Sequence, residues 1–203
     1  MDITGIILAG GKSRRMGKDK RYLRVGESTL LERTVATMAG IFTDVSIVIA
    51  QDSPPLALPG CQVHRDVIAD CGSLGGLYTG LLLATTARIF VVACDMPFLN
   101  PALIRWFLDR DPLADVVMAR LPDGAQPMHA VYGKGVLPAL HRMAERRTLN
   151  IRTLLEDPSI RATLVLPEEW GPLDPSGWSF QNVNTPADLE TARAYLRQDV
   201  SAE

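Results

Sequence analysis

The side chains best suited to bind an anion lie close together near the N-terminus. Residues 8–20 read LAGGKSRRMGKDK and combine three glycines with a series of Lys and Arg residues. Glycine lets a backbone bend and approach a ligand with no Cβ in the way. Amide N–H groups and cationic side chains can then converge on one anion, and a polyphosphate fits that description. On composition alone, a solvated basic surface loop is an equally good interpretation.

Two common phosphate-binding loops do not fit this segment. A Walker A loop has four residues between its glycines, followed by Lys and Ser or Thr. Here five residues separate Gly11 from Gly17, and Lys18 is followed by Asp19, which has no hydroxyl group. A dinucleotide-binding turn has glycines at its first, third and sixth positions, and the adjacent pair Gly10-Gly11 does not supply them.

The second candidate for chemistry is a carboxylate. Residues 89–94 read IFVVAC, the most strand-like run in the chain, and Asp95 follows directly. Open α/β sheets bind their ligands at the carboxyl ends of strands. Asp95 could hold Mg²⁺, which favours one or two carboxylates together with substrate phosphates. The alternative is a cap for the next helix, but Asn100 and Pro101 already provide a cap and a first-turn proline, so the metal is favoured.

Other polar positions carry weaker signals. The GSLGG run at residues 72–76 could present helix N–H groups to a ligand, but tight helix packing explains it better. Asn182 and Asn184 would face the same way on an extended strand and form a hydrogen-bonding edge. His129 lies among apolar neighbours and is expected to be a satisfied structural histidine. Three arginines could meet an anionic substrate, although a solvated helix face is the better interpretation: Arg146, Arg147 and Arg152.

Composition excludes several classes of protein. The 203 residues carry a formal net charge of −2, so the basic residues of the N-terminal loop are a local concentration, and a general nucleic-acid binder is not expected. The three cysteines form no C-x-x-C pair, which favours reduced thiols over a disulfide framework or zinc site. No segment resembles a signal peptide or a membrane span. We therefore expect a soluble cytoplasmic protein without membrane association.

Strand-like and helix-like segments alternate along the chain. The expected strands are residues 5–8, 45–50, 61–64, 89–94, 115–119, 128–132 and 178–184, with a polar loop at 121–127. The expected helices start after Thr29, at Gly72, at Pro101, at Leu137, at Thr148 and after Thr185. Thr29 and Glu32 have the spacing of a capping box. This alternation predicts one α/β domain, a three-layer α/β/α sandwich with a mainly parallel sheet, over residues 1–203.

Residues 8–20 also resemble a known family. They match the pattern L-A-G-G-x-S-x-R-M-G-x-D-K of the molybdenum cofactor guanylyltransferases, the MobA family, which are nucleotidyltransferases of Rossmann-like fold. Asp95-Met96-Pro97 and the NVNTP run at residues 182–186 also match, whereas Ser73 and Gly75 depart from the family's G-P-L-A-G. The resemblance implies transfer of GMP from GTP to molybdopterin or molybdenum cofactor, with release of pyrophosphate.

The resemblance also implies roles for individual residues. Arg15 and Lys20 would hold phosphates, and Asp95 would bind both the nucleotide and Mg²⁺. The remaining nucleotide contacts would be Leu8, Ala9, Gly10, Gly11 and Asp66, with Asn182 and Asn184 on the molybdopterin side. The N-terminal half would thus bind the nucleotide and the C-terminal half the molybdopterin, with cofactor-delivery and acceptor proteins as possible partners.

Two other functions remain open at this point. The first is another nucleotidyltransferase, acting with CTP on molybdopterin or with an NTP on a sugar phosphate. Cytidylyl relatives tend to carry L-A-A-G where this chain has LAGG at residues 8–11, which favours guanine. The second is a non-catalytic nucleotide-binding or assembly module, and the presence of both Lys20 and Asp95 argues against it.

Overall fold

A seven-stranded sheet forms the centre of the molecule in the computed structural model, which describes residues 3–10 and 19–200. The strand order is β5-β4-β1-β6-β8-β7-β9. These strands are β1 (Ile3–Leu8), β4 (Val45–Ile49), β5 (Gln62–Arg65), β6 (Arg88–Ala93), β7 (Val116–Leu121), β8 (Gly124–Gly133) and β9 (Ala162–Val165). Strand β8 runs antiparallel to β6 and β7, and the other pairs are parallel. The predicted mainly parallel sheet is confirmed.

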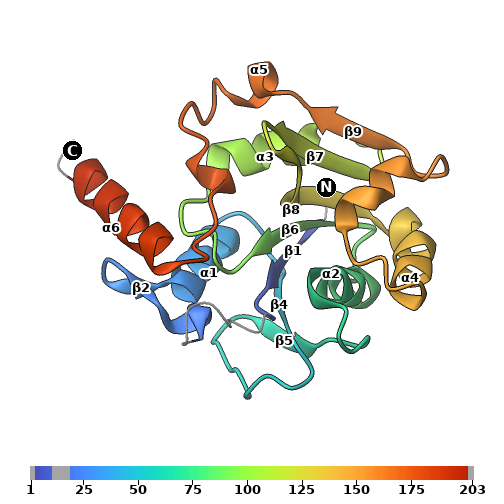
Figure 1. The fold of residues 1–203 in the computed structure, drawn as a ribbon, viewed down its shortest axis with the longest axis horizontal. Coiled ribbons are helices and arrows are strands. Elements are labelled where there is room, and N and C mark those ends of the chain that lie inside the picture. Colours follow the sequence, from blue (N-terminus) through green and yellow to red (C-terminus); the bar gives the residue numbers. More distant parts are fainter. Residues whose placement is uncertain (1–2, 11–18, 201–203) are drawn as a thin grey trace.

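Helices cover both faces of this sheet. The α-helices are α1 (Leu30–Ala39), α2 (Gly72–Leu83), α3 (Pro101–Asp109), α4 (Leu137–Glu145), α5 (Pro167–Trp170) and α6 (Pro186–Val200). Figure 1 shows α1 and α3 on one face and α2 and α4 on the other. Neighbouring residues of β1 contact opposite layers: a Cβ on Gly5 would lie 2.8 Å from Phe42, just after α1, and a Cβ on Gly80 of α2 would lie 2.8 Å from Ile6. The predicted three-layer sandwich is confirmed.

Local sequence signals explain several of these elements. Every residue of β1 and β4 is buried, as expected for parallel strands covered on both faces. Thr29 and Glu32 form the predicted capping box at the start of α1. Asn100 caps α3 by accepting hydrogen bonds from the amides of Ala102 and Leu103. The carboxylate of Asp95 is therefore not used as the cap of α3.

The predicted polar loop at residues 121–127 is wrong. Strands β7 and β8 continue to a tight hairpin, in which Leu121 pairs with Gly124. Gly124 has a φ of +123°, which favours glycine. The register shifts between Met118 and Ala119, so β8 bulges there and accommodates Pro127, which has no amide proton for the ladder. The sequence indicated a polar loop because the bulge cannot be recognised from the sequence.

The predicted strand at residues 178–184 is also wrong. Trp178–Phe180 forms a 3₁₀ helix, η4, and no regular element covers residues 181–184. The buried carboxylate of Asp174 accepts a hydrogen bond from the amide of Ser179 at 2.9 Å, which curls the chain. One backbone bond, from the Val183 amide to the Asp95 carbonyl oxygen at 2.9 Å, then fixes the following residues beside the end of β6.

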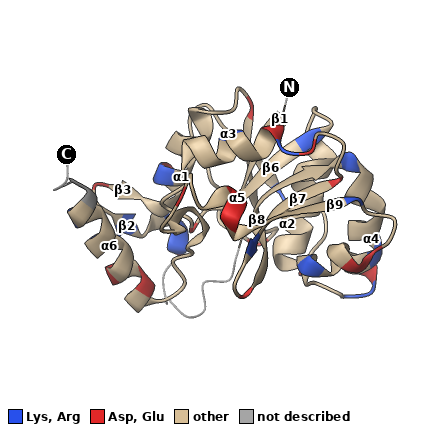
Figure 2. Cartoon of the chain, turned by 90° about the horizontal axis from the view of Figure 1, so that it is seen from above, with Lys and Arg blue, Asp and Glu red and all other residues tan. Residues whose placement is uncertain are grey.

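A small second cluster lies beside the main core. The hairpin of β2 (Arg24–Val25) and β3 (Ser28–Thr29) packs against α6. Figure 2 shows this unit projecting to one side of the sheet. The cluster contains the buried residues Val25, Leu30, Val183, Leu189 and Ala192. Since β2 follows Lys20 and α6 follows Asn184, the cluster fixes two chain segments that are far apart in the sequence.

The remaining short helices are of the 3₁₀ type: η1 (Lys20–Tyr22), η2 (Lys134–Val136) and η3 (Ile151–Glu156). The helix predicted from Thr148 is therefore present as η3, three residues later than expected. Within the described ranges 3–10 and 19–200, none of the helices has the length and apolar character needed to cross a membrane.

Candidate functional site

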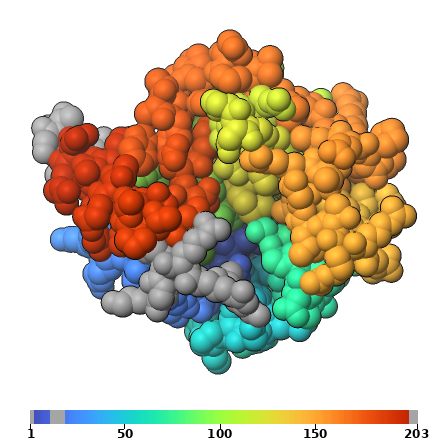
Figure 3. Space-filling model, in the orientation of Figure 1, coloured from blue at the N-terminus to red at the C-terminus, as the bar shows by residue number. Residues whose placement is uncertain are grey.

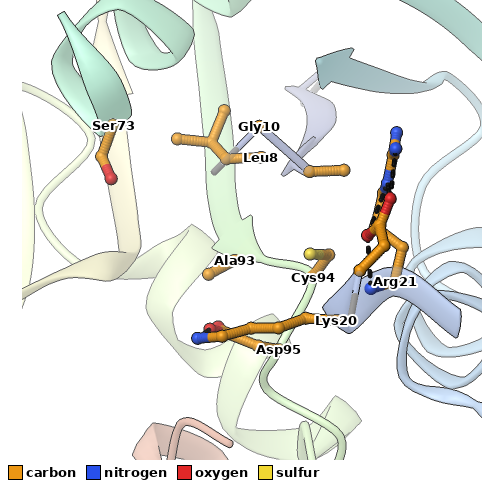
Figure 4. A pocket seen from close by; sticks show the side chains of 10 residues that line it. Leu8, Gly10, Lys20, Arg21, Ser73, Ala93, Cys94 and Asp95 are labelled. Carbon is orange, nitrogen blue, oxygen red and sulfur yellow. Dashed lines mark hydrogen bonds and ion pairs between the residues drawn. The ribbon is translucent and has the colours of Figure 1, made fainter. Parts of the chain in front are cut away.

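A cavity opens at the carboxyl ends of β1 and β6, the position at which the sequence placed the site. It is lined by Leu8, Ala9, Gly10, Asp19, Lys20, Arg21, Ser73, Ala93, Cys94 and Asp95 (Figure 4). In the space-filling view a depression lies between the red C-terminal segment and the turquoise α2, with the blue of β1 at its bottom (Figure 3). Five predicted site residues, Leu8, Ala9, Gly10, Lys20 and Asp95, therefore border one cavity.

Lys20 and Asp95 form the polar centre of this cavity. The Nζ atom of Lys20 lies 3.2 Å from Oδ2 of Asp95 and donates to Oδ1 of Asn184 at 2.6 Å. The other carboxylate oxygen of Asp95, Oδ1, accepts from Nδ2 of Asn182 at 2.7 Å. Both asparagines therefore reach the same ion pair, although the segment that carries them is not a strand. The Lys20 and Asp95 side chains are only 17% and 15% exposed, so water screens the pair weakly.

The cap at the start of α6 holds Asn184 in place. The Asp188 carboxylate at the start of α6 accepts from the amides of Asn184 and Thr185, both at 2.8 Å. The Thr185 hydroxyl accepts in return from the Asp188 amide at 3.1 Å, which confirms the predicted start of α6. This reciprocal cap orients Asn184 just before the helix, where it meets Lys20.

Gly10 is required by the packing of the chain itself. A Cβ at this position would lie 2.7 Å from the backbone nitrogen of Ala50, at the end of β4. Glycine is thus needed for close approach between two backbones as the chain leaves β1. The other predicted loop residues, Gly11 and Arg15, lie outside the described residues.

The glycines of α2 serve packing, as the sequence favoured. A Cβ on Gly76 would lie 3.2 Å from Leu8, and one on Gly75 would lie 3.0 Å from the Ile68 carbonyl oxygen. Ser73, at the N-terminal end of the same helix, borders the cavity. The departure from the family pattern at Ser73 thus places a hydroxyl-bearing residue at the site.

Two arginines hold loops in place, a role the sequence did not predict. Arg147 donates to the Asp70 carbonyl oxygen at 2.9 Å, in the loop before α2, and Arg152 donates to the Asp123 carbonyl oxygen at 2.9 Å, in the β7–β8 hairpin. The side chain of Arg147 therefore joins the end of α4 to the loop before α2, and that of Arg152 holds the β7–β8 hairpin, where a solvated helix face had been expected.

The buried thiol and imidazole near the site are in neutral forms. Burial, together with the nearby carboxylates Asp95 and Asp19, raises the pKa of Cys94 to about 12, so its thiol stays protonated. Burial lowers the pKa of His129 to about 4. Three aromatic rings surround His129, those of Phe90, Phe107 and Phe180. Its structural placement is as predicted, but neither ring nitrogen has a hydrogen-bond partner within the described part of the chain.

Asp66 lies outside this cavity, at the end of β5. Its side chain is buried, and Oδ1 accepts from the Thr79 hydroxyl of α2 at 3.0 Å. Burial raises the pKa of Asp66 to about 6, although the Thr79 hydrogen bond lowers it. The Thr79 oxygen also accepts from the Val67 amide at 3.0 Å, so Asp66 belongs to a link between β5 and α2. A nucleotide contact by Asp66 stays a prediction.

Asp66→Asn is expected to make stability less dependent on pH. Because the folded-state pKa lies above the ordinary value of 3.8, the protonated form contributes stability that is fully present below pH 4 and is lost as the pH rises through about 6. The neutral amide avoids that loss, so the variant should gain about 1–3 kcal/mol over the parent protein at pH 8 and nothing at pH 4. Urea unfolding from pH 4 to 8 measures this, with the exposed Asp123→Asn as control; equal pH profiles would contradict it.

Comparisons with known proteins show which proteins this chain is similar to. Residues 5–162 match the family described as MobA-like NTP transferase domain. A probable molybdenum cofactor guanylyltransferase of Pelotomaculum thermopropionicum is 36% identical over 193 residues, covering 95% of this chain and 93% of its own. A protein of Chloroflexus aggregans with the same description is 37% identical, covering 97% of this chain and 96% of its own.

A solved structure supports the fold. The crystal structure of molybdopterin-guanine dinucleotide biosynthesis protein A from Archaeoglobus fulgidus superposes with a TM-score of 0.82. It covers 97% of this chain and 100% of that chain at 22% identity. At that level of identity, the similarity to that structure concerns the fold alone.

Proposed function

Because the chain belongs to the MobA-like NTP transferase family, we propose that it transfers GMP from GTP to molybdopterin or molybdenum cofactor. The products are the guanine dinucleotide form of the cofactor and pyrophosphate. The observation that carries this proposal is the Lys20–Asp95 pair, 3.2 Å apart in one cavity at the carboxyl ends of β1 and β6. A cation for phosphates and a carboxylate for a metal are thus next to each other.

The reaction needs no nucleophile from the protein. A phosphate oxygen of the pterin attacks the α-phosphorus of GTP, the bond from that phosphorus to the bridging oxygen breaks, and pyrophosphate leaves. Lys20, 3.2 Å from the carboxylate, donates to phosphate oxygens and stabilises the departing pyrophosphate. Arg15 shares this role, and the backbone of residues 8–11 contacts the nucleotide. The protonated Cys94 thiol beneath the site agrees with a mechanism of positioning and charge neutralisation.

The carboxylate oxygens of Asp95 suit Mg²⁺, a hard cation that would arrive together with its substrate. Both carboxylate oxygens already have partners, Lys20 and Asn182. The described residues contain no cluster of three or more His, Cys, Asp or Glu side chains able to hold a metal without further ligands. Mg²⁺ suits one carboxylate combined with phosphate oxygens and water. When bound, it would neutralise the charge of the phosphates, with Asp95 as its protein ligand.

The two substrates would meet across the same cavity. The nucleotide would lie against the N-terminal half, on residues 8–11 and Lys20, with Asp66 as an outer contact. Asn182 and Asn184, which reach Asp95 and Lys20 from the C-terminal half, would face the molybdopterin. We place this reaction in the cytoplasm, where cofactor-delivery and acceptor proteins would supply the substrate and take the product.

Nucleotide choice and product release test this function. Calorimetry should find that GTP with Mg²⁺ binds at least ten times more tightly than CTP with Mg²⁺, and addition of molybdopterin should release one pyrophosphate per guanylylated product. Tighter binding of CTP would instead indicate a cytidylyltransferase. Binding of GTP without pyrophosphate release in the presence of molybdopterin would indicate a non-catalytic nucleotide-binding module.

A further inference from the structure

The short helix η1 carries Lys20 between two side chains that bind each other. Oδ1 of Asp19 accepts from the Arg21 amide and from Arg21 Nε, both at 3.0 Å. Oδ2 of Asp19 accepts from Nε at 2.9 Å and from Nη2 at 2.5 Å. The Asp19 carboxylate therefore caps η1 and also binds the guanidinium of Arg21. These bonds connect the residue before Lys20 to the residue after it.

Burial makes this pair different from an ordinary surface ion pair. Arg21 is 4% exposed, and its Nη1 atom is buried without a hydrogen-bond partner in the part of the chain that the structure describes. A surface pair contributes little, but a buried guanidinium is held in place by its one carboxylate, and breaking such a pair is costly. The hydrogen bonds that the Arg21 guanidinium donates to the Asp19 carboxylate raise the pKa of Arg21, in keeping with a tightly held cation.

The two side chains leave η1 in different directions. Figure 4 shows Lys20 extending toward Asp95, while Arg21 extends in another direction. The Arg21 guanidinium donates to the Asp19 carboxylate instead. Lysine has a flexible four-carbon stem, so the position of its ammonium depends on how firmly its backbone is held. In η1 the Asp19–Arg21 pair fixes the backbone on both sides of Lys20.

We propose that Arg21 is a positioning residue, which, through its bonds to Asp19, fixes the turn from which Lys20 reaches Asp95 and the phosphates of the substrate. The proposal rests on the phosphate-binding role of Lys20 in the proposed function. The competing explanation is that Arg21, which also borders the cavity, touches the substrate directly. These two roles differ in whether the effect of Arg21 requires Lys20.

A double-mutant comparison separates the two roles. GTP binding and guanylyl transfer are measured for Arg21→Gln, Arg21→Lys, Lys20→Met and the Lys20→Met/Arg21→Gln double variant, with the exposed Arg24→Gln as matched control. We expect Arg21→Gln to lower kcat/KM roughly 10- to 100-fold and Arg24→Gln to leave it within twofold. Arg21→Lys should not restore activity, because an ammonium cannot make the two parallel bonds. In the Lys20→Met background, Arg21→Gln should add less than a twofold effect.

A second measurement follows Lys20 without any substrate. After ¹³C reductive methylation, the NMR signal of Lys20, assigned by its loss in Lys20→Arg, should shift in Arg21→Gln and remain unchanged in Arg24→Gln. If Arg21→Gln fails to fold by circular dichroism, Arg21→Met takes its place, since an apolar side chain can fill the buried space while the half-exposed Asp19 turns to water.

The outcomes distinguish this proposal from the proposed function. An independent loss caused by Arg21→Gln in the Lys20→Met background, or an unmoved Lys20 signal, would overturn the positioning role and leave the guanylyltransferase intact. A parent protein that releases no pyrophosphate from GTP and molybdopterin would overturn the proposed function, while the NMR shift would still decide whether Arg21 positions Lys20.

Discussion

Asp95→Ala should lower kcat/KM for guanylyl transfer by roughly 10³-fold, or about 4 kcal/mol of transition-state stabilisation. Asp95 accepts from Lys20 through one oxygen and from Asn182 through the other, so its removal takes away the acceptor at the centre of the site. It also removes the proposed ligand of Mg²⁺. The loss should appear mainly in kcat, since Lys20 remains available to the phosphates of GTP.

The fold should survive this substitution. The backbone hydrogen bond from the Val183 amide to the carbonyl oxygen of residue 95 remains, so the C-terminal segment stays in contact with the end of β6. Thermal unfolding should therefore stay within a few degrees of the parent protein. Mn²⁺ binding followed by electron paramagnetic resonance, with GTP present, should weaken at least tenfold in Asp95→Ala. The exposed Asp109→Ala, on the last turn of α3, is the matched control.

Activity retained at saturating Mg²⁺ would remove the metal role from Asp95. A normal Mn²⁺ affinity with low activity would point instead to a purely electrostatic role for the carboxylate. In the first case the contacts of Lys20 and Asn182 with Asp95 would have a structural role only.

The parts of the fold that could be predicted from the sequence depend on local chemistry. The capping box at Thr29 and the Asn100-Pro101 cap work within a few residues, so their spacing identifies the helix starts. The wholly buried strands β1 and β4 are mostly apolar along their whole length, because helices cover both faces. The position of Asp95 followed from the same reasoning, since parallel strands end at one edge of the sheet.

The wrong predictions involve contacts between distant or curled segments. The alternation in residues 178–184 is typical of a strand, yet the bond from Ser179 to Asp174 curls the chain into η4. This curled segment brings Asn182 to Asp95, a contact that the alternation of apolar and polar residues does not predict. The hairpin at residues 121–124 was not predicted, because the bulge in β8 interrupts the alternation of apolar and polar residues that indicates a strand.

Five of the predicted site residues border one cavity, but the sequence did not show all of the side-chain pairs that bind one another there. Lys20 and Asp95 were expected to meet, and they do. The pairing of Asp19 with Arg21 was not predicted. The two side chains meet because η1 is a 3₁₀ helix and Asp19 is its N-cap. The single acid within a basic loop was a signal that could have indicated such an internal partner. The roles of Gly11 and Arg15 stay predictions.

Lys20→Met should weaken GTP binding and slow turnover together. The substitution keeps most of the length of the side chain and removes the ammonium that lies 3.2 Å from Asp95 and 2.6 Å from Asn184. A cation that contacts phosphates in both the ground state and the transition state contributes to both parameters. We expect the Kd for GTP to rise about tenfold and kcat/KM to fall roughly 10²- to 10³-fold.

Two further variants make this result specific to Lys20. Lys134→Met removes an exposed ammonium at the amino end of β6, where Lys134 donates to the Ala84 carbonyl oxygen, and should leave both parameters within twofold. Lys20→Arg keeps the charge, but its planar guanidinium does not fit a position where one compact ammonium lies between two acceptors. This variant should therefore be little more active than Lys20→Met. Calorimetry with GTP and a pyrophosphate-release assay measure these changes. Unchanged affinity and turnover in Lys20→Met would mean that the phosphates bind elsewhere, and the site at the ends of β1 and β6 would lose its proposed substrate.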